Sequence, residues 1–435
     1  MEHFVEEELK TIVSEGAFGK NCSLMSFKLY NCMADMEEWW YEKIFCNITT
    51  SDGSHYSIMI KLKIQDLEMR GCFGCDFLFN NELIFYKKIV PFLLECRGPT
   101  VNDAHALFVP RLFYGRNTFS KLTANDVIII ENVSSLGYCL SNTKVFLDYE
   151  HLIIALRTIA KFHGLSYTAK HKHPGRIYDI MENVHNVQFD ANGHWMSQND
   201  IFKKCGKRGV NRLLERDGDR YQDHVHIRRL NELFDDADKT LMQTLKAQEP
   251  LSVICHSDFH RDTLLFQYDE DGRPFDALTI DFYSVHYGSP ALDLSSFLYM
   301  STTQRVRELH WDDFLDTYCA ALAASVQPDV PVPGRAEIDV EMAETAINAF
   351  AKVSFCLPFK LRDRSDTLDS LATSDDPLDY FLELGGDMAT ECLADMVQHF
   401  VDMGYTDVRR ESCDVNSNHA KDAKSTYCES SQQLS

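Results

Sequence analysis

The chain has 435 residues, of which 45% are hydrophobic and 25% are charged, so it is neither disordered throughout nor fibrous. Its formal net charge is −23, from 43 Lys and Arg residues against 66 Asp and Glu residues. Because phosphates and anionic lipids attract basic surfaces, this charge disfavours sequence-independent binding to nucleic acid or to an anionic membrane.

The N-terminal residues are acidic and lack the basic segment and apolar run of a secretory signal. No apolar run reaches the roughly 18 residues that a membrane-spanning helix needs, so we expect no such helix. The 14 cysteines are scattered along the chain, which is typical of reduced thiols. We therefore expect an intracellular, cytoplasmic protein.

Gly16 and Gly19 stand near the start of the chain, where a glycine-rich nucleotide loop would lie. The segment is not a P-loop, because Ser14 and Asn21 replace the glycine and the hydroxyl residue that this motif requires. We predict a nucleotide-binding role for both glycines. An ordinary turn between two strands is the alternative.

Short runs rich in Ile and Val predict that the first 130 or so residues are mostly strand. Examples are Ser57–Lys63 and Val127–Ile130, and one helix over about residues 79–94 interrupts them. After residue 147, apolar residues recur at helical spacing, as in residues 150–163 and 341–355. The result is an α+β chain with a strand-rich first lobe, a helical second lobe and a polar, flexible tail. Their predicted bounds are residues 1–133, 134–408 and 409–435.

A strand–loop–strand segment within the helical part carries two aspartates, each after a β-branched run. Asp258 follows Val253-Ile254 and Asp281 follows Ile280, with a predicted hairpin turn at residues 269–274 between them. The hairpin would bring both carboxylates to one end of a small sheet. Phosphoryl transfer uses such a pair: one accepts the proton of the acceptor hydroxyl and the other holds Mg²⁺ against the phosphates. Asp is also a common turn residue, so the pair alone is compatible with an ordinary hairpin.

Three features earlier in the chain favour a phosphoryl-transfer site over an ordinary hairpin. Lys61 interrupts an apolar strand, where a charge is costly unless it is paired. Glu82 lies on the following predicted helix, and the run of residues 128–133 leads from a strand into a loop where a hinge would lie. Lysine, glutamate, hinge and the two aspartates thus follow one another in the order of a kinase.

With these residues the chain resembles the ecdysteroid kinase-like, or CHK kinase-like, family, which belongs with choline kinases and aminoglycoside phosphotransferases in the protein-kinase-like fold. The resemblance covers about residues 10–405. It rests mainly on three motifs: His256-Ser-Asp-Phe259, Ile280-Asp-Phe-Tyr283 and Tyr287-Gly-Ser-Pro-Ala-Leu-Asp-Leu294. It implies a bilobal fold and transfer of the γ-phosphate of ATP, with Mg²⁺, to a hydroxyl of a small acceptor. Steroid-like or xenobiotic alcohols and choline-like molecules are the acceptor classes it implies.

The resemblance also implies roles for individual residues. Asp258 would be the catalytic base and Asp281 the metal ligand. Lys61 would contact the α- and β-phosphates, with Glu82 as its partner. Asp293 would brace the catalytic loop and His163 would pack on its helix. The backbone that would hold the adenine comprises Glu131, Asn132 and Val133.

Two departures from the family pattern leave an alternative open. Ser257 stands where the family usually has Gly, and Thr263 stands where it has an Asn that serves as a second Mg²⁺ ligand. Thr263 offers only a hydroxyl, and the neighbouring Asp262 is a better oxygen donor for Mg²⁺. The alternative to a kinase is therefore a pseudokinase, a binding or scaffolding protein with the same fold and little turnover. The sequence does not predict the oligomeric state.

Overall fold

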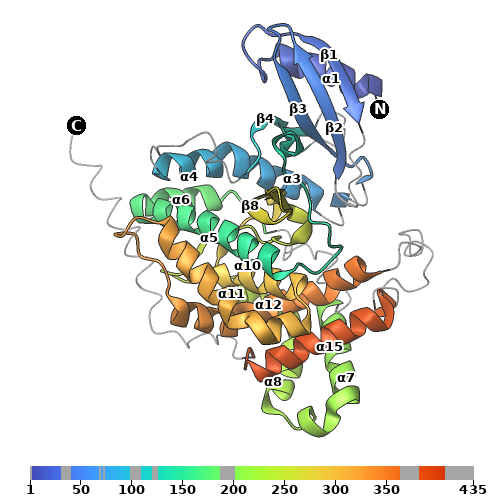
Figure 1. The fold of residues 1–435 in the computed structure, drawn as a ribbon, viewed down its shortest axis with the longest axis vertical. Helices are drawn as coiled ribbons and strands as arrows, with labels where there is room; N and C mark the ends of the chain where they lie inside the picture. The colour runs from blue at the N-terminus through green and yellow to red at the C-terminus, as the bar shows by residue number, and fades with distance from the viewer. Residues whose placement is uncertain are drawn as a thin grey trace, which may run out of the picture.

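A strand-rich region and a helical region lie at opposite ends of the molecule in the computed structural model, with short strands between them (Figure 1). The structure describes the following residues: 2–30, 41–67, 70–71, 74–97, 109–119, 126–186, 201–362 and 382–406. The predicted α+β class, with a strand-rich first lobe and a mainly helical second lobe, is confirmed. The boundary between residues 133 and 134 stays a prediction, and the predicted tail lies outside the described residues.

The sheet of the first lobe has five antiparallel strands in the order β1-β2-β3-β5-β4. These strands are β1 (Leu24–Tyr30), β2 (Tyr41–Thr50), β3 (His55–Lys63), β4 (Leu112–Arg116) and β5 (Val127–Glu131). The register places Lys43 of β2 opposite Lys61 of β3, so both side chains lie on one face of the sheet. Because successive side chains of a strand alternate between faces, Ile58 and Ile60 face the other way.

A helix that the sequence interpretation did not include covers this second face. It is α1 (Glu2–Ser14), whose Val5, Leu9 and Ile12 are buried in one cluster with Ile58 of the sheet. We expected the first 130 or so residues to be mostly strand with one interrupting helix, and α1 is a second helix that this prediction lacked. The apolar residues of α1 recur at three and four residues, which is the helical period and was an available signal.

The predicted helix over residues 79–94 is confirmed and is longer than expected. It comprises α3 (Cys75–Ile84), a π-helical turn η1 (Phe85–Ile89) and α4 (Val90–Arg97). Pro91 lacks an N–H, and its ring crowds the carbonyl of Lys87, which explains why the helix widens just before it. This segment packs against the face of the sheet that carries Lys61.

Helices dominate the second lobe, and the two predicted over residues 150–163 and 341–355 are both confirmed. The main helices are α5 (Tyr149–Lys172), α6 (Pro174–Met181), α7 (Ile201–Tyr221), α8 (Val225–Asp235), α9 (Ala237–Thr244), α10 (Pro290–Ser301), α11 (Gln304–Ser325), α12 (Arg335–Leu361) and α15 (Gly386–Asp402). α10 packs on α12, and α5 packs on α11 (Figure 1). Of the helices that the structure describes, none is long and apolar enough to cross a lipid bilayer.

Four short strands lie between the sheet and these helices. They form two antiparallel pairs: β6 (Val253–Cys255) with β9 (His286–Gly288), and β7 (Leu264–Tyr268) with β8 (Pro274–Thr279). The predicted hairpin is therefore confirmed as β7 and β8. Asp258 follows β6 and Asp281 follows β8, so the two predicted site residues lie on neighbouring loops of this region.

Candidate active site

Lys61 is the centre of a buried charged cluster between the sheet and α3. Its Nζ lies 2.5 Å from Oε1 of Glu82 on α3, and it also donates to Oδ1 of Asp281 after β8. The three side chains have no exposed surface. A charge in the apolar run of β3 is stable only when it is paired in this way. The structure thus brings together the predicted lysine, its predicted partner on the helix and the predicted metal ligand.

Strand β2 supplies two further contacts to Asp281. The hydroxyl of Tyr41 donates to Oδ1 over 3.0 Å, and Nζ of Lys43 lies 3.8 Å from Oδ2. Burial works to raise the pKa of Asp281, but Lys61 and Lys43 lower it to about 2. Burial raises the pKa of Glu82 to about 7, and Lys61 offsets only part of this effect. Asp281 therefore holds its negative charge more firmly than Glu82 does.

Oδ2 of Asp281 is buried and has the ion pair with Lys43, but it accepts no hydrogen bond from any residue that the structure describes. A buried acceptor without a donor is costly, and a carboxylate oxygen is the kind of ligand that Mg²⁺ prefers. Asp281 also has a φ of 68°, in the left-handed region that non-glycine residues seldom adopt and that is enriched at functional sites. The donor set at Asp281 thus fits a divalent cation.

Asp258 lies on the loop after β6, and both of its carboxylate oxygens have partners. Nζ of Lys352 on α12 lies 2.6 Å from Oδ1, and the hydroxyl of Tyr283 donates to Oδ2. Nε2 of His260 lies 3.5 Å from Oδ2. Burial works to raise the pKa of Asp258, but Lys352 and His260 hold it well below its usual range. The carboxylate is therefore ionised at neutral pH and fixed in orientation.

Sequence reasoning assigned no role to Lys352 or Tyr283. Tyr283 lies two residues after Asp281, within a motif that the resemblance already used, and this proximity was an available signal. Lys352 is 94 residues away from Asp258 in sequence and lies on a different element. Nothing in the local pattern of α12 indicates that contact.

Thr263 and Asp262 were predicted as further metal ligands, and both side chains form hydrogen bonds with other residues of the protein. The Thr263 hydroxyl donates to the carbonyl of Asp258 over 2.9 Å and accepts from the N–H of His260 over 3.1 Å. Oδ1 of Asp262 lies 2.5 Å from the guanidinium of Arg261, and its Oδ2 accepts from Lys360 on α12. The hydroxyl of Thr263 thus braces the loop, and Asp262 is neutralised by cations.

The predicted hinge residues lie at the end of β5. The N–H of Glu131 donates to the carbonyl of Arg111 over 2.8 Å, and the N–H of Asn132 donates to the carbonyl of Ser57 over 2.9 Å. The side chain of Asn132 caps the short 3₁₀ helix η3 (Val133–Leu136), and Val133 is buried. Contact of this backbone with adenine stays a prediction.

Gly16 and Gly19 do not lie between two strands, so the alternative of an ordinary turn between strands is wrong. They follow α1 and precede β1, and both have positive φ, 91° and 132°. The N–H of Gly16 donates to the carbonyl of Val13, which ends the helix. Phe18, between the two glycines, is buried in the cluster of α1, on the sheet face opposite to Lys61. This turn therefore ends α1, and a nucleotide-binding role for the two glycines stays a prediction.

The ecdysteroid kinase-like family matches residues 43–328, which is well over half of the chain and includes both aspartate loops. The chain belongs to this family. Its members are kinase-like small-molecule phosphotransferases. No curated protein matches the chain.

Solved structures similar to this ecdysteroid kinase-like protein include three phosphotransferases at low sequence identity. Macrolide 2′-phosphotransferase type I is 12% identical, over 88% of this chain and 96% of its own, with a TM-score of 0.37. Amicoumacin kinase hAmiN, in complex with AMP-PNP, Ca²⁺ and Ami, is 11% identical over 88% and 96%, with a TM-score of 0.40. Choline kinase LicA from Streptococcus pneumoniae is 13% identical over 91% and 99%, with a TM-score of 0.38.

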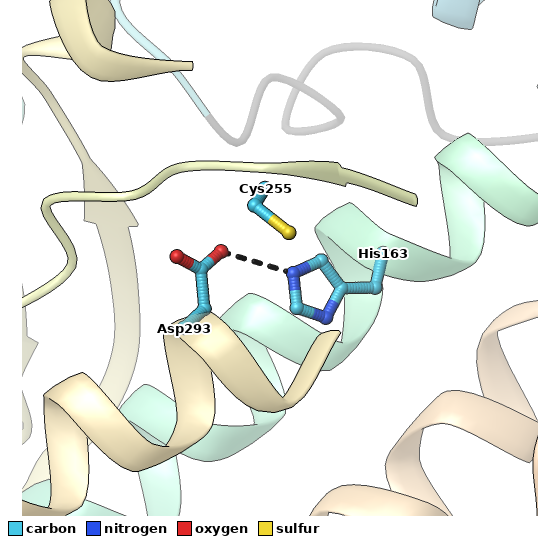
Figure 2. A group of neighbouring side chains, drawn as sticks. All are labelled: His163, Cys255 and Asp293. Atoms are coloured by element: carbon cyan, nitrogen blue, oxygen red, sulfur yellow. Dashed lines mark hydrogen bonds and ion pairs between the residues drawn. The ribbon is translucent and has the colours of Figure 1, made fainter. Parts of the chain in front are cut away.

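Asp293 on α10 holds the Asp258 loop of this ecdysteroid kinase-like protein in place. The backbone N–H groups of His256 and Ser257 donate to its two carboxylate oxygens, each over 2.7 Å. Nε2 of His163 lies 3.1 Å from the same carboxylate. Figure 2 shows this hydrogen bond as a dashed line. The predicted bracing role of Asp293 is confirmed. His163 was expected only to pack on its helix, and it also takes part in this hydrogen-bond network.

The same network accounts for the serine in place of the family glycine. Ser257 has a φ of 63°, a region where glycine has no steric penalty and serine does. Its N–H bond to the ionised Asp293 helps to hold that conformation.

His163, Cys255 and Asp293 lie close enough together to hold a metal ion (Figure 2). Both oxygens of Asp293 already accept backbone hydrogen bonds, so Asp293 and His163 brace the loop. The Cys255 thiol instead donates to the carbonyls of Gly288 and Ser289.

Proposed function

We propose that this protein is an ATP- and Mg²⁺-dependent kinase that transfers the γ-phosphate of ATP to a hydroxyl of a small acceptor. The proposal rests on one observation: each of the two loop aspartates forms an ion pair with a different lysine. Lys61 joins Asp281 to Glu82, and Lys352 joins Asp258 to α12. Family membership supports the same reaction class.

In this proposal Asp281 is the residue that holds the metal. Its Oδ2, which accepts no hydrogen bond from the described residues, and its firmly held negative charge suit a hard cation. Mg²⁺, when bound, would neutralise charge on the β- and γ-phosphates. Lys61 would exchange its bond to Asp281 for one to the phosphates and keep its bond to Glu82. Glu82 would thereby orient the ammonium group.

Asp258 accepts the proton of the acceptor hydroxyl in this proposal. Its low pKa makes it a weak base, which is compatible with a phosphoryl transfer in which positioning and electrostatics dominate. Lys352 and Tyr283 fix the carboxylate, and the acceptor hydroxyl would replace the Tyr283 hydroxyl on Oδ2. Thr263 then acts by bracing the backbone of Asp258 rather than as a metal ligand.

The remaining parts of the proposal are the adenine contact and the cellular setting. The backbone of residues 131–133 would hold the adenine, and the acceptor would be a steroid-like or xenobiotic alcohol. We also propose a cytoplasmic location, which the free cysteines of the described residues support.

A transfer assay with labelled nucleotide tests this function. The purified protein is incubated with γ-labelled ATP, Mg²⁺ and a panel of small alcohols, and the labelled products are separated and identified. We expect a labelled acceptor that is absent when EDTA is added and absent with Asp258→Asn. Full transfer by Asp258→Asn would remove Asp258 as the base.

The pseudokinase alternative rests on the single hydroxyl at Thr263, which is already engaged with the loop backbone. It predicts nucleotide binding without turnover. A thermal-shift titration with ATP, with and without Mg²⁺, separates the two functions. Stabilisation that requires Mg²⁺ supports the kinase, whereas metal-independent stabilisation with no labelled product across the panel supports the pseudokinase.

A further inference from the structure

A tyrosine from the loop of the proposed metal ligand reaches across to the loop of the proposed base. Tyr283 lies on the 3₁₀ turn η7 (Phe282–Ser284), directly after Asp281, and its hydroxyl donates to Oδ2 of Asp258. Nζ of Lys352 donates to the other oxygen over 2.6 Å. Both oxygens of Asp258 therefore accept hydrogen bonds from the protein itself.

Little of the Asp258 carboxylate is left for a water molecule. Its side chain is 11% exposed. A carboxylate oxygen has two lone pairs, and Oδ2 has two neighbours: the hydroxyl of Tyr283 and, at 3.5 Å, Nε2 of His260. A hydrogen bond to an ionised group is stronger than one between neutral groups. The hydroxyl of Tyr283 is therefore a strong competitor for the place where another hydroxyl would give up its proton.

The backbone of the turn is fixed, so freeing Oδ2 requires movement of the tyrosine side chain alone. The carbonyl of Tyr283 accepts from Nδ2 of Asn81 on α3 over 3.1 Å. The buried ring of Phe282 stacks on Phe85 of η1, with ring centroids 3.6 Å apart and an angle of 7° between the planes. Tyr283 itself is only half-buried. A rotation of its side chain would thus expose Oδ2 and leave Asp281 in place.

We propose that Tyr283 is a gate on the base: its hydroxyl keeps water away from Oδ2 of Asp258 and gives way to a bound acceptor. The inference rests on the proposed kinase function and adds how the site discriminates against water. An acceptor gains binding energy from contacts along its whole body, and part of that energy can displace the tyrosine hydroxyl. Water makes no such further contacts, so it displaces the hydroxyl far less often. Acceptor binding and access to the base are thereby coupled.

The reaction that this gate suppresses is the hydrolysis of ATP. When Oδ2 is accessible, a water molecule gives its proton to Asp258 while its oxygen bonds to the γ-phosphorus. The bond between that phosphorus and the ADP oxygen breaks, and ADP leaves with the electron pair. The products are ADP and inorganic phosphate, and the proton passes from Asp258 to solvent. Tyr283→Phe removes the hydroxyl and keeps the ring, so it should raise the rate of this reaction.

A partition measurement tests the gate. The protein is incubated with γ-labelled ATP and Mg²⁺, first alone and then with choline or ecdysone, and labelled inorganic phosphate and labelled alcohol are quantified in the same reaction. Tyr283→Phe should release inorganic phosphate about 10- to 100-fold faster than the wild type, the factor that corresponds to one hydrogen bond to a charged group. The double variant Tyr283→Phe/Asp258→Asn should lose the gained hydrolysis. The ratio of hydrolysis to transfer should rise in Tyr283→Phe, and a general loss of activity cancels from this ratio.

Tyr287→Phe is the matched control. It removes a hydroxyl that donates to Oε1 of Glu249 over 2.6 Å, and neither residue contacts Asp258. Its rate of hydrolysis should equal that of the wild type. Tyr283→Ala is a second test variant, which removes the ring as well and should hydrolyse ATP at least as fast as Tyr283→Phe. Thermal unfolding of each variant checks that it is folded.

Hydrolysis that is unchanged or slower in Tyr283→Phe would overturn the gate. A rise confined to Tyr283→Ala would assign the shielding to the ring and overturn the role of the hydroxyl. Label on Tyr283 of the wild-type protein, located by mass spectrometry, would make this hydroxyl an acceptor instead of a gate.

Failure of the kinase function gives a different result. Hydrolysis that rises in Tyr283→Phe and stops in the double variant, with no labelled alcohol from any protein, keeps the gate and removes transfer to an alcohol. Transfer to an alcohol without a rise in hydrolysis in Tyr283→Phe keeps the kinase and removes the gate.

Discussion

The two aspartates of the candidate site are held in opposite ways. Asp281 is fully enclosed, and its partners Lys61 and Tyr41 come from the strands of the first lobe. Asp258 is also buried but keeps 11% of its side chain exposed, and its charged partner Lys352 comes from a helix of the second lobe. Asp281 keeps one oxygen without a hydrogen bond, whereas both oxygens of Asp258 have partners.

This difference matches the two ligands that the proposed reaction needs. A metal ion brings its own positive charge and can replace a lysine on a buried carboxylate. An alcohol brings no charge, so the carboxylate that receives it has to be ionised and oriented beforehand by the protein. The enclosed aspartate therefore suits the metal, and the accessible one suits the acceptor.

The largest expected effect is a difference in activity and ATP binding between variants of the two aspartates. Asp258→Asn should lower kcat by about 10²- to 10⁴-fold, the usual contribution of a general base, and leave the affinity for ATP nearly unchanged. Asp281→Asn should instead abolish the Mg²⁺ dependence of ATP binding. Calorimetric titration of both variants with ATP, with and without Mg²⁺, checks this. Loss of nucleotide affinity in both variants to the same extent would show that the two carboxylates share one role.

The next effect concerns stability. Lys61→Met removes the cation that Glu82 and Asp281 share and leaves Asp281 only the more distant Lys43, which should lower the free energy of unfolding by about 3–5 kcal/mol. Lys352→Met breaks a more exposed pair and should cost only about 2 kcal/mol. Urea unfolding curves of both variants measure the difference. The contrast between the enclosed and the accessible site is refuted if the Lys352 variant is the less stable of the two.

These residues also show how far the sequence alone reaches. Lys61 and Glu82 were predictable because each stands within a local pattern, a β-branched strand and the helix that follows it. The β7–β8 hairpin was predictable for the same reason, but Asp258 follows β6, which pairs with β9 in a separate sheet and not with the hairpin. For residues within one motif or on consecutive elements, the spacing in the sequence predicts which side chains lie close together.

Contacts between distant elements were not predictable in this way. Lys352 reaches Asp258 only because α12 packs beside the loop, and no spacing in the sequence encodes that contact. The engagement of Thr263 with the Asp258 carbonyl depends on the loop conformation rather than on residue type. The helix α1 is a different case, because the helical spacing of its apolar residues is visible in the sequence. The helix was not predicted because the strand-like runs that follow it led us to expect mostly strand.

A smaller effect tests Lys352 through pH. Because Lys352 and His260 hold the pKa of Asp258 below its usual range, this carboxylate, the proposed base, stays ionised at every pH above the ordinary range of an aspartate. Stability from this pair is present at such pH values and is lost as the pH falls through the depressed pKa of the folded state. In Lys352→Met the effect of burial prevails, so the pKa of Asp258 should rise and the acidic limb of kcat/KM should move to higher pH. An acidic limb at the same pH in both proteins would show that Lys352 does not control the base.

The smallest expected effect lies at Thr263, which separates loop bracing from metal binding. Thr263→Ala removes the hydroxyl that donates to the Asp258 carbonyl and accepts from the N–H of His260. It should lower the free energy of unfolding by about 1 kcal/mol per lost hydrogen bond, with only a modest loss of kcat. Thr263→Ser keeps the hydroxyl and is the matched control. Because the brace does not involve the metal, the Mg²⁺ concentration for half-maximal activity should stay the same in Thr263→Ala, and a clear increase would identify the hydroxyl as a metal ligand instead.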